Sequence, residues 1–585
     1  MSLGQLPAVE QQLVAEVSGD ELLRHTEAIA QWVRLSGSED EARAFDYIAA
    51  TCEGFGMEVR RYQVDSLVSW PQAATLEVLG DAPRSIPCIT HAFSASTAGA
   101  GIEGEVVYAP GADTSDPSGT SLRGKIVLSD GLANPGKAVG AEAAGVLAQI
   151  NINDAHVHEM IITPIWGTPT PQTAGLLPRL VAVSVNAADG EELRRTARAG
   201  ALRVRITTQV DTRWRAIPTL TAELPGREDR FVLFSGHVDS WHYGAMDNGT
   251  ANATMLEVAR LLGGRRDDLR RGLRLAFWSG HSHGRYSAST WYADHFWPDL
   301  HERCVAHVNV DSTGGMGAEV LSEANTMAET VGFAGRAIRE VAGQELDYKR
   351  FGRAGDQSFW GVGLPSIFMS LSGQPAQGGA VEEQMARLLG SGGRGRSGGL
   401  GWWWHTTEDT LDKIDRVNLV RDTRVYALTC WRLCTEPILP LDYHATAQEL
   451  LGVLRDYARQ ARDRFDLGPV LREAEALDRA TAALNEARRS AGEADAERLN
   501  ACLMALGRWL TPLNYTLAGE FDHDLALSVP PIPALEPVKR LAALDPATDE
   551  AKFLATQLVR ARNRVWHGLH GANREIAGTL KTSDE

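Results

Sequence analysis

The chain has 585 residues, of which 58 are basic and 75 acidic, and a formal net charge of -17 at pH 7. This length exceeds what one hydrophobic core supports, so several domains are expected. The acidic balance argues against nucleic acid or an anionic membrane as partner, and no stretch reaches the ~18 uninterrupted apolar residues of a membrane span. Six scattered cysteines and an N-terminus without a signal-peptide pattern predict a cytoplasmic protein.

The N-terminal region is predicted to be helical and is followed by a region of short strands. Residues 18–21 are typical of a helix start, and residues 39–52 place apolar side chains on one helix face. From about residue 65 the sequence changes to short β-type runs broken by Gly, Pro, Asp and Ser. One helix, over residues 135–150, interrupts these runs. We therefore predict a mostly β domain over residues 65–215.

Residues 216–440 alternate between apolar strands and helices, which indicates a mainly parallel sheet covered by helices. The predicted strands are FVLFSGH, LRLAFWSG, CVAHVNVD and LPSIFMS. In such a sheet, ligands bind beyond the carboxyl ends of the strands. Residues 372–401 end in a Gly-rich run that forms either a lid or a mobile surface loop. From residue 441 to 585 the chain is predicted to be helical.

Histidines and aspartates follow these strands at the positions where ligands are expected. His237 ends the first strand, Asp247 follows in the next loop, Asp311 follows the third strand, and His405 follows the Gly-rich run. Imidazole and carboxylate together are suitable ligands for zinc, manganese or cobalt. Two imidazoles and two carboxylates, one of which bridges, are what a two-metal site needs.

Two further aspartates lie close to these candidates in the sequence. Asp239 is two residues beyond His237, on the same face of an extended chain, where it could orient the imidazole as part of the catalytic machinery. Asp409 lies one turn beyond His405 and either orients that ligand or caps the following helix.

These motifs resemble those of the co-catalytic zinc aminopeptidases, especially the branch of glutamate carboxypeptidase II and the transferrin receptor. The matching pieces are HVDSW, GAMDNGTANATMLEVAR, LRLAFW, HVNVDSTGG, GDQSFWGVGLPS and WWWHTTEDTLDKID. The resemblance implies an α/β fold, a three-layer α/β/α metallopeptidase sandwich formed by residues 1–64 and 216–440. It also implies a protease-associated β insertion at 65–215 and a helical dimerisation domain at 441–585.

The resemblance also implies a homodimer that uses zinc, as one or two ions, on a small-molecule or peptide substrate. His237 and Asp311 would hold one ion, His405 would hold the other, and Asp247 would bridge them. The predicted function is metal-dependent hydrolysis of amide or peptide bonds in small peptides or N-acyl amino acids. The alternatives are a lyase or unusual amidase that uses histidine as base, and a non-catalytic binding or scaffold protein.

The chain departs from this family in the turn after LRLAFW. The family has two consecutive glutamates there, a general base and a metal ligand, whereas this chain reads GHSHGRYSAST. Alignment on Gly284 puts His281 at the base position and Ser282 at the ligand position. Alignment on residues 288–290 instead puts Ser282 at the base position and His283 at the ligand position. We favour His283 as ligand and His281 as base or further ligand; the alternative is a decayed site, as in the transferrin receptor.

Three side chains are candidates for substrate binding. Arg285 follows the His-Ser-His turn and Arg353 precedes GDQSFW, so both would suit an acidic substrate, although solvated surface arginines are the alternative. Trp404 ends a run of three tryptophans before His405. It would either wall an apolar pocket or pack a domain interface.

Overall fold

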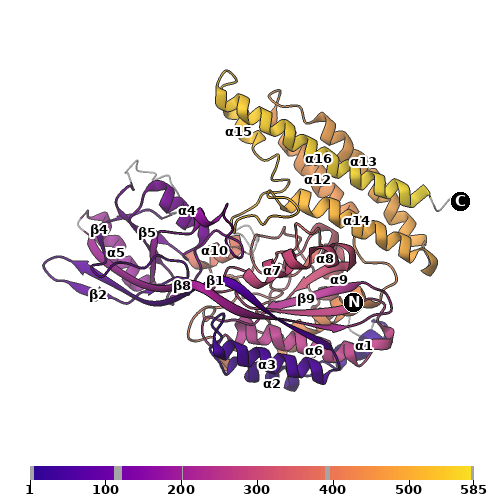
Figure 1. Cartoon of the computed structure of the whole chain (residues 1–585), viewed down its shortest axis with the longest axis horizontal. Coiled ribbons are helices and arrows are strands. Elements are labelled where there is room, and N and C mark those ends of the chain that lie inside the picture. Colours follow the sequence, from indigo (N-terminus) through magenta and orange to yellow (C-terminus); the bar gives the residue numbers. More distant parts are fainter. Residues whose placement is uncertain (1–5, 111–121, 201, 389–395, 582–585) are drawn as a thin grey trace.

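The computed structural model describes residues 6–110, 122–200, 202–388 and 396–581. These residues form a central sheet covered by helices, a β insertion to its left in Figure 1, and a helical arm that lies above it in the same view. The middle of the predicted Gly-rich loop, residues 389–395, lies outside the described residues. Within the described chain, no helix is both long and apolar enough to cross a membrane.

The strands beneath the candidate site are mutually parallel, in the order β12-β11-β9-β10. They are β9 (Phe231–His237), β10 (Gly272–Trp278), β11 (Cys304–Asn309) and β12 (Ser366–Ile367). Every residue of these strands is buried. Burial on both faces explains why each strand is an uninterrupted apolar run rather than an alternating one. The predicted mainly parallel sheet is confirmed.

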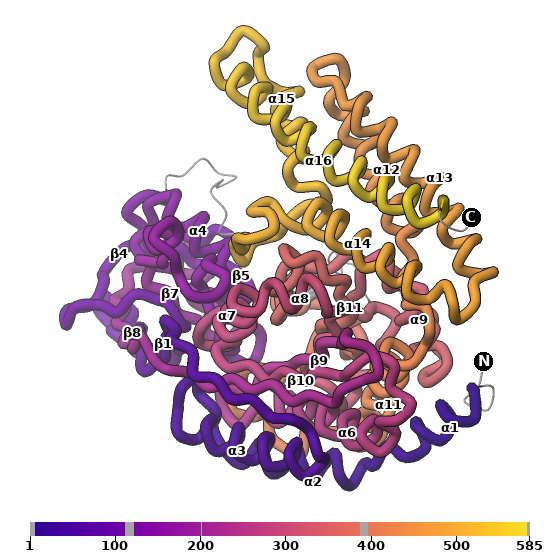
Figure 2. The backbone as a smooth tube through the Cα atoms, turned by 45° about the vertical axis from the view of Figure 1, so that its right-hand side comes forward, coloured from indigo at the N-terminus to yellow at the C-terminus, as the bar shows by residue number. Residues whose placement is uncertain are grey.

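Helices cover both faces of this sheet (Figure 2). One face carries α1 (Ala8–Ala15), α2 (Gly19–Ala30), α3 (Glu39–Gly54), α6 (Ala251–Gly263) and α11 (Arg416–Thr435); the other carries α7 (Ser287–His295) and α8 (Trp297–Arg303). Val232 and Phe234 of β9 pack in the core beside α6, whereas Phe231 and Leu233 pack in the core beside α7. This two-residue alternation is the period of a strand, and it divides the core into the two halves of a three-layer sandwich. Helix α9 (Ala328–Ala342) packs against α11.

Two long antiparallel strands connect the central sheet to the insertion. They are β1 (Glu58–Leu79) and β8 (Arg203–Leu224), which pair along their whole length. At one end β8 also pairs with β10, and at the other end it pairs with β4 (Ile102–Tyr108). The predicted domain boundaries near residues 65 and 215 therefore fall inside continuous strands.

The insertion adds further strands to the sheet and two helices. Its elements are β2 (Arg84–Ile86), β3 (Ile89–Thr90), β5 (Ile126–Asp130), α4 (Pro135–Ala144), β6 (Ala148–Ile152), β7 (Val181–Val185) and α5 (Ala187–Arg198). The helix predicted over residues 135–150 is present and begins at Pro135, but it is shorter than predicted. Helix α4 ends at Ala144 because Gly145 takes a left-handed conformation, with φ 72°, and residues 148–152 then form a buried strand.

The C-terminal region is helical, as predicted. Helices α12 (Tyr443–Ala461), α13 (Gly468–Ser490), α14 (Ala496–Tyr515), α15 (Val538–Ala543) and α16 (Asp549–Lys581) form the arm in Figure 1. Helix α10 (Ala380–Leu388) forms within the segment predicted as a loop, and its Met385 lines the cleft described below.

Candidate metal centre

The carboxyl ends of three neighbouring strands bring candidate ligands together. His237 is the last residue of β9, His281 follows β10, and Asp311 follows β11. One potential ligand atom from each lies within 4.8 Å of the others. Because parallel strands end at the same edge of a sheet, residues far apart in sequence meet at this point.

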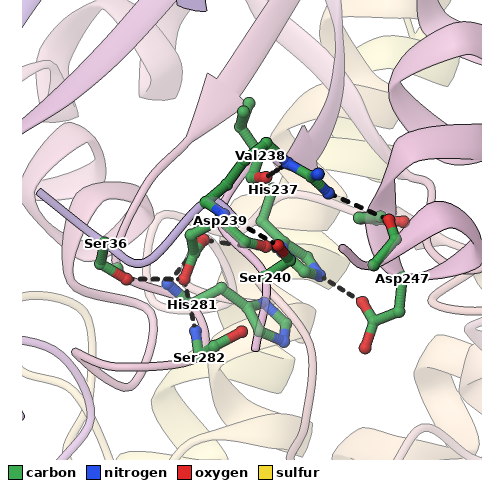
Figure 3. Close-up of polar contacts among 12 residues, drawn as sticks. Ser36, His237, Val238, Asp239, Ser240, Asp247, His281 and Ser282 are labelled. Atoms are coloured by element: carbon green, nitrogen blue, oxygen red, sulfur yellow. Dashed lines mark hydrogen bonds and ion pairs between the residues drawn. The ribbon is translucent and has the colours of Figure 1, made fainter. Parts of the chain in front are cut away.

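Asp247 lies between two imidazoles. Its Oδ1 is 3.1 Å from Nε2 of His237, as Figure 3 shows, and its Oδ2 is 3.1 Å from Nε2 of His405. Asp311 approaches the same nitrogen of His237, with its Oδ2 at 3.6 Å. The structure thus gathers four of the predicted ligands, and it places Asp247 where one oxygen faces each histidine.

The buried polar atoms at this point fit a metal ion. Nε2 of His237 and Oδ1 of Asp247 are both buried and face each other at 3.1 Å as an ion pair, but neither makes a hydrogen bond of regular geometry among the described residues. Burial opposes a charge on His237, but contacts with Asp239, Asp247 and Asp311 outweigh it and raise the pKa of His237 well above its usual value. The carboxylates therefore require a cation here, either a proton or a metal. Nitrogen and carboxylate oxygen donors match the ligand preference of zinc.

Asp239 is fully buried and connects the first ligand to the turn after β10. Its backbone carbonyl accepts a hydrogen bond from Nδ1 of His237 at 2.9 Å, which leaves Nε2 to face the other ligands. Its carboxylate accepts hydrogen bonds from the hydroxyl of Ser36 at 2.7 Å and from the backbone N–H of Ser282 at 2.8 Å. Asp239 thus connects the end of β9 to the turn that follows β10 (Figure 3).

His281 joins the group of ligands through a carboxylate that the sequence reasoning missed. The rings of His281 and His237 are stacked, with centroids 3.7 Å apart. Nδ1 of His281 lies 2.8 Å from Oδ2 of the buried Asp356, so its Nε2 remains for the cleft. The other oxygen of Asp356 accepts a hydrogen bond from the hydroxyl of Ser289 at 2.7 Å. The sequence feature that could have identified Asp356 was its position within GDQSFW, one of the motifs that resemble the family.

His283, the residue favoured as ligand from the sequence, lies outside this group. It is fully buried, and its Nδ1 is 3.0 Å from the hydroxyl of Ser36 and 3.8 Å from Oδ2 of Asp239. Its ring packs against Trp241, with centroids 4.4 Å apart. The turn therefore directs His281, not His283, toward the other candidate ligands.

Comparison with known proteins assigns this domain. Residues 219–429 match the model of peptidase family M28. We refer to the matching part of the chain as the M28 domain. A zinc aminopeptidase from Bacillus subtilis superposes with a TM-score of 0.54 over 72% of this chain and 97% of its own, at 20% identity. An M28 peptidase precursor from Shewanella amazonensis gives a TM-score of 0.56 over 74% and 96%, at 19% identity. These likenesses confirm the α/β fold.

Two relatives each match less than half of this chain. A probable glutamate carboxypeptidase of Zea mays is 26% identical over 271 residues, which are 42% of this chain and 35% of the relative. Carboxypeptidase Q of Bos taurus is 27% identical over 280 residues, 45% of this chain and 58% of the relative. The chain thus spans less than two thirds of the length of these relatives.

The insertion reaches the M28 domain at His405. Nδ1 of His405 donates to the backbone carbonyl of Glu159 at 2.6 Å, and the N–H of Glu159 donates to the carbonyl of His405 at 3.0 Å. The ring of Trp404 stacks on that of His405, with centroids 3.4 Å apart. The two hydrogen bonds between His405 and Glu159 fix the orientation of the imidazole.

Asp409 acts on Asp247 rather than on His405. Its two oxygens accept hydrogen bonds from the backbone N–H groups of Met246 and Asp247, at 2.9 and 3.0 Å. Burial, together with the nearby charge of Asp247, raises the pKa of Asp409 to about 7. The following helix, α11, is capped by Asp415 instead.

A cleft of about 60 Å³ opens beside the candidate ligands of the M28 domain. Arg285 and Trp404 line it, whereas Arg353 does not; Arg353 stacks on Trp166 and donates to two backbone carbonyls. The described lining is Met160, Ile161, Trp241, Asp247, His281, Ser282, Arg285, Tyr286, Asp311, Ala354, Gly355, Met369, Ser370, Met385, Leu400, Trp404 and His405. Met160 and Ile161 come from the insertion, so the insertion forms one wall of the cleft.

Proposed function

We propose that the protein is a zinc-dependent hydrolase that cleaves amide or peptide bonds in small peptides or N-acyl amino acids. The observation that carries the proposal is the grouping of His281 with His237 and Asp311 at the strand ends. Its imidazole would stand in for a ligand that relatives supply as a carboxylate. The match of residues 219–429 to the M28 family model supports metal-dependent peptide hydrolysis as the general chemistry.

In this proposal His237, His281 and Asp311 hold one ion, and His405 holds a second. Asp247, with one oxygen toward each histidine, bridges the two. Bound zinc supplies Lewis acidity, which polarises a carbonyl group and makes water a stronger acid. The protein contributes fixed ligand orientations: Asp356 holds His281, the carbonyl of Asp239 holds His237, and Asp409 holds the backbone of Asp247.

A second role for His281, as proton acceptor, is favoured by its bond to Asp356. A carboxylate that accepts the Nδ1–H bond fixes the tautomer of the ring and leaves Nε2 as the nitrogen that can accept a proton. No glutamate is present among the described residues of the cleft lining. In this role Nε2 of His281 would take the proton from the attacking water and leave the ion with one ligand fewer.

Zinc content tests the proposal and separates the two roles. We expect close to two zinc ions per chain in the wild-type protein by elemental analysis, and turnover of dipeptides or N-acyl amino acids. A His281→Ala variant that loses one ion identifies a ligand; one that keeps both ions but loses turnover identifies a base. His283→Ala is the matched control and should keep both ions. Absence of zinc from the wild-type protein after incubation with excess zinc would leave the scaffold alternative.

We also propose a cytoplasmic homodimer assembled through the C-terminal arm. Support comes from the resemblance, from six unpaired cysteines, and from large apolar side chains exposed on α16, where Phe553 is 73% exposed and Trp566 is 37% exposed. Light scattering of the wild-type protein and of a Phe553→Ser, Trp566→Ser variant tests this: we expect twice the chain mass for the first and a lower mass for the second.

A further inference from the structure

We propose that Arg285 binds a carboxylate of the substrate, so that the cleft selects molecules carrying a free carboxylate beside an apolar group. This inference rests on the proposed hydrolase function and names the substrate class for the same cleft. It assigns to Arg285 the recognition of charge and to the neighbouring walls the recognition of apolar side chains.

Arg285 is a buried cation on the cleft wall. It follows the turn that carries His281 and lines the same cleft as Asp247 and His405. Only 6% of its surface is exposed, and its backbone has a φ of 49°, in the left-handed region that ordinary side chains seldom adopt. The turn thus holds this side chain in the cleft at some cost in backbone energy.

The guanidinium uses few of its hydrogen-bond donors. Nη2 donates to the backbone carbonyl of Ile161 at 2.7 Å, while Nε is buried with no partner. Among the described residues, no carboxylate lies within ion-pair distance of Arg285. A guanidinium has five N–H donors, and burying an unpaired charge is unfavourable. The side chain is therefore left with donors that a ligand could satisfy.

Other buried arginines of this molecule make more contacts with the protein, although Nε of Arg271 and Arg353 also lacks a hydrogen-bond partner. Arg274 and Arg432 each form ion pairs with two carboxylates. Arg34 donates to five backbone carbonyls. Arg285 contacts the carbonyl of Ile161 and the side chain of Tyr286 but pairs with no carboxylate among the described residues, although it is comparably buried. Its environment is that of a binding group rather than of a packing group.

The rest of the lining supports a single binding point for an anionic group, at Arg285. Arg285 is the only arginine or lysine among the described lining residues, and the two carboxylates there, Asp247 and Asp311, belong to the proposed metal ligands. Met160, Ile161, Met369, Met385, Leu400 and Trp404 make the remaining wall largely apolar. A planar guanidinium pairs with a carboxylate through two parallel hydrogen bonds, which lysine cannot do. N-acyl amino acids and short peptides with an apolar terminal residue fit this lining.

Two ligands that differ only in charge test the proposal. N-acetyl-L-leucine and N-acetyl-L-leucinamide would be titrated by calorimetry into zinc-loaded protein, as wild type and as the Arg285→Met and Arg285→Lys variants. We expect the wild type to bind the carboxylate at least about tenfold more tightly than the amide, since a charge-assisted pair contributes more than a neutral one. The ratio should fall to near one in Arg285→Met and to an intermediate value in Arg285→Lys.

Three results would overturn the assignment. One is failure of the wild type to prefer the carboxylate, including absence of binding by either ligand. Another is a ratio that persists in Arg285→Met, which would place the carboxylate on the metal. The last is an equal loss for both ligands with a lower melting temperature, as expected if Arg285 only ties the cleft to Ile161. If Arg285→Met does not fold, the Arg285→Lys ratio alone decides, and an unchanged ratio counts against the proposal.

Arg353→Met is the control for losing a buried arginine outside the cleft lining. We expect it to lower the melting temperature and leave the carboxylate-to-amide ratio at the wild-type value. The hydrolase proposal is judged separately, by zinc content and turnover. If the protein prefers the carboxylate ligand but has neither zinc nor turnover, Arg285 binds carboxylates and the hydrolase proposal is rejected. If it has turnover but no preference for the carboxylate, the hydrolase proposal stands and the role of Arg285 is rejected.

Discussion

The pairing of His281 with Asp356 would compensate for the charge that the proposed metal site loses if, as the family resemblance implies, histidine stands in place of a glutamate. A neutral imidazole in place of a carboxylate makes a metal site more positive by one charge. The buried carboxylate of Asp356, 2.8 Å from Nδ1 of His281, supplies a negative charge on the side of the imidazole that faces away from the proposed metal. The pair of side chains therefore carries what one glutamate would carry, with the imidazole nitrogen as the softer donor.

Replacing Asp356 by asparagine should weaken zinc binding. The amide keeps the shape but not the charge, and loss of such an outer partner typically costs about 10–100-fold in metal affinity. Competition with a chromophoric chelator measures this affinity directly. Ser289→Ala is the matched control, because it removes only the hydroxyl bond to the other oxygen of Asp356 and should cause a smaller loss. Equal zinc affinity in wild type and Asp356→Asn would show that Asp356 has no such role.

Which histidine of the turn faces the ligands depends on a contact that a sequence does not reveal. His237, Asp247, Asp311 and His405 could be picked out because strand ends and matching motifs surround each of them. His281 and His283 are equally placed by spacing. The backbone N–H of Ser282 donates to Asp239, and this bond fixes the turn so that His281 faces the cleft while His283 packs beside Ser36.

At the scale of elements, buried strands were predictable and long exposed ones were not. Strands β9, β10 and β11 are apolar along their whole length, because both faces are covered. Strands β1 and β8 mix polar, exposed and buried positions over 22 residues each. Their extent is set by pairing with each other, which depends on the tertiary fold rather than on local composition. The predicted domain boundaries fell inside them for that reason.

The junction of α9 and α12 contains a buried acid whose titration should be visible in stability. Burial raises the pKa of Glu329 to about 7, and its carboxylate accepts a hydrogen bond from Thr446 of α12 at 2.8 Å. Between pH 4.5 and 7 the unfolded chain releases this proton while the folded chain keeps it. The free energy of unfolding therefore falls as pH rises through this window, by up to about 3 kcal/mol.

Glu329→Gln should remove this part of the pH dependence. Gln resembles the protonated acid and does not titrate, so the variant should gain about 2 kcal/mol relative to wild type between pH 5 and pH 8. Urea unfolding at the two pH values measures the difference. Thr446→Val is the control, because it removes the hydroxyl but keeps the titrating acid and its pH dependence. Parallel pH profiles for wild type and Glu329→Gln would contradict the prediction.

At the scale of the whole molecule, the insertion and the M28 domain meet at the proposed metal ligands. The backbone of Glu159 exchanges two hydrogen bonds with His405, and the carbonyl of Ile161 accepts one from Arg285. One short segment of the insertion therefore contacts both a proposed ligand and the proposed substrate anchor. A metal that immobilises His405 should also immobilise this segment, since ligand binding to the folded state suppresses local opening.

Zinc should accordingly slow amide hydrogen exchange in residues 153–163. The N–H of Glu159 donates to the carbonyl of His405, so opening of this contact requires the two domains to separate locally. We expect at least about tenfold slower exchange in this segment after zinc loading, measured by mass spectrometry, with little change in the distant arm. His405→Ala should abolish the zinc effect by removing the imidazole that connects the metal to the insertion. If exchange in residues 153–163 is the same with and without zinc, the insertion only packs beside the centre and does not respond to its occupancy.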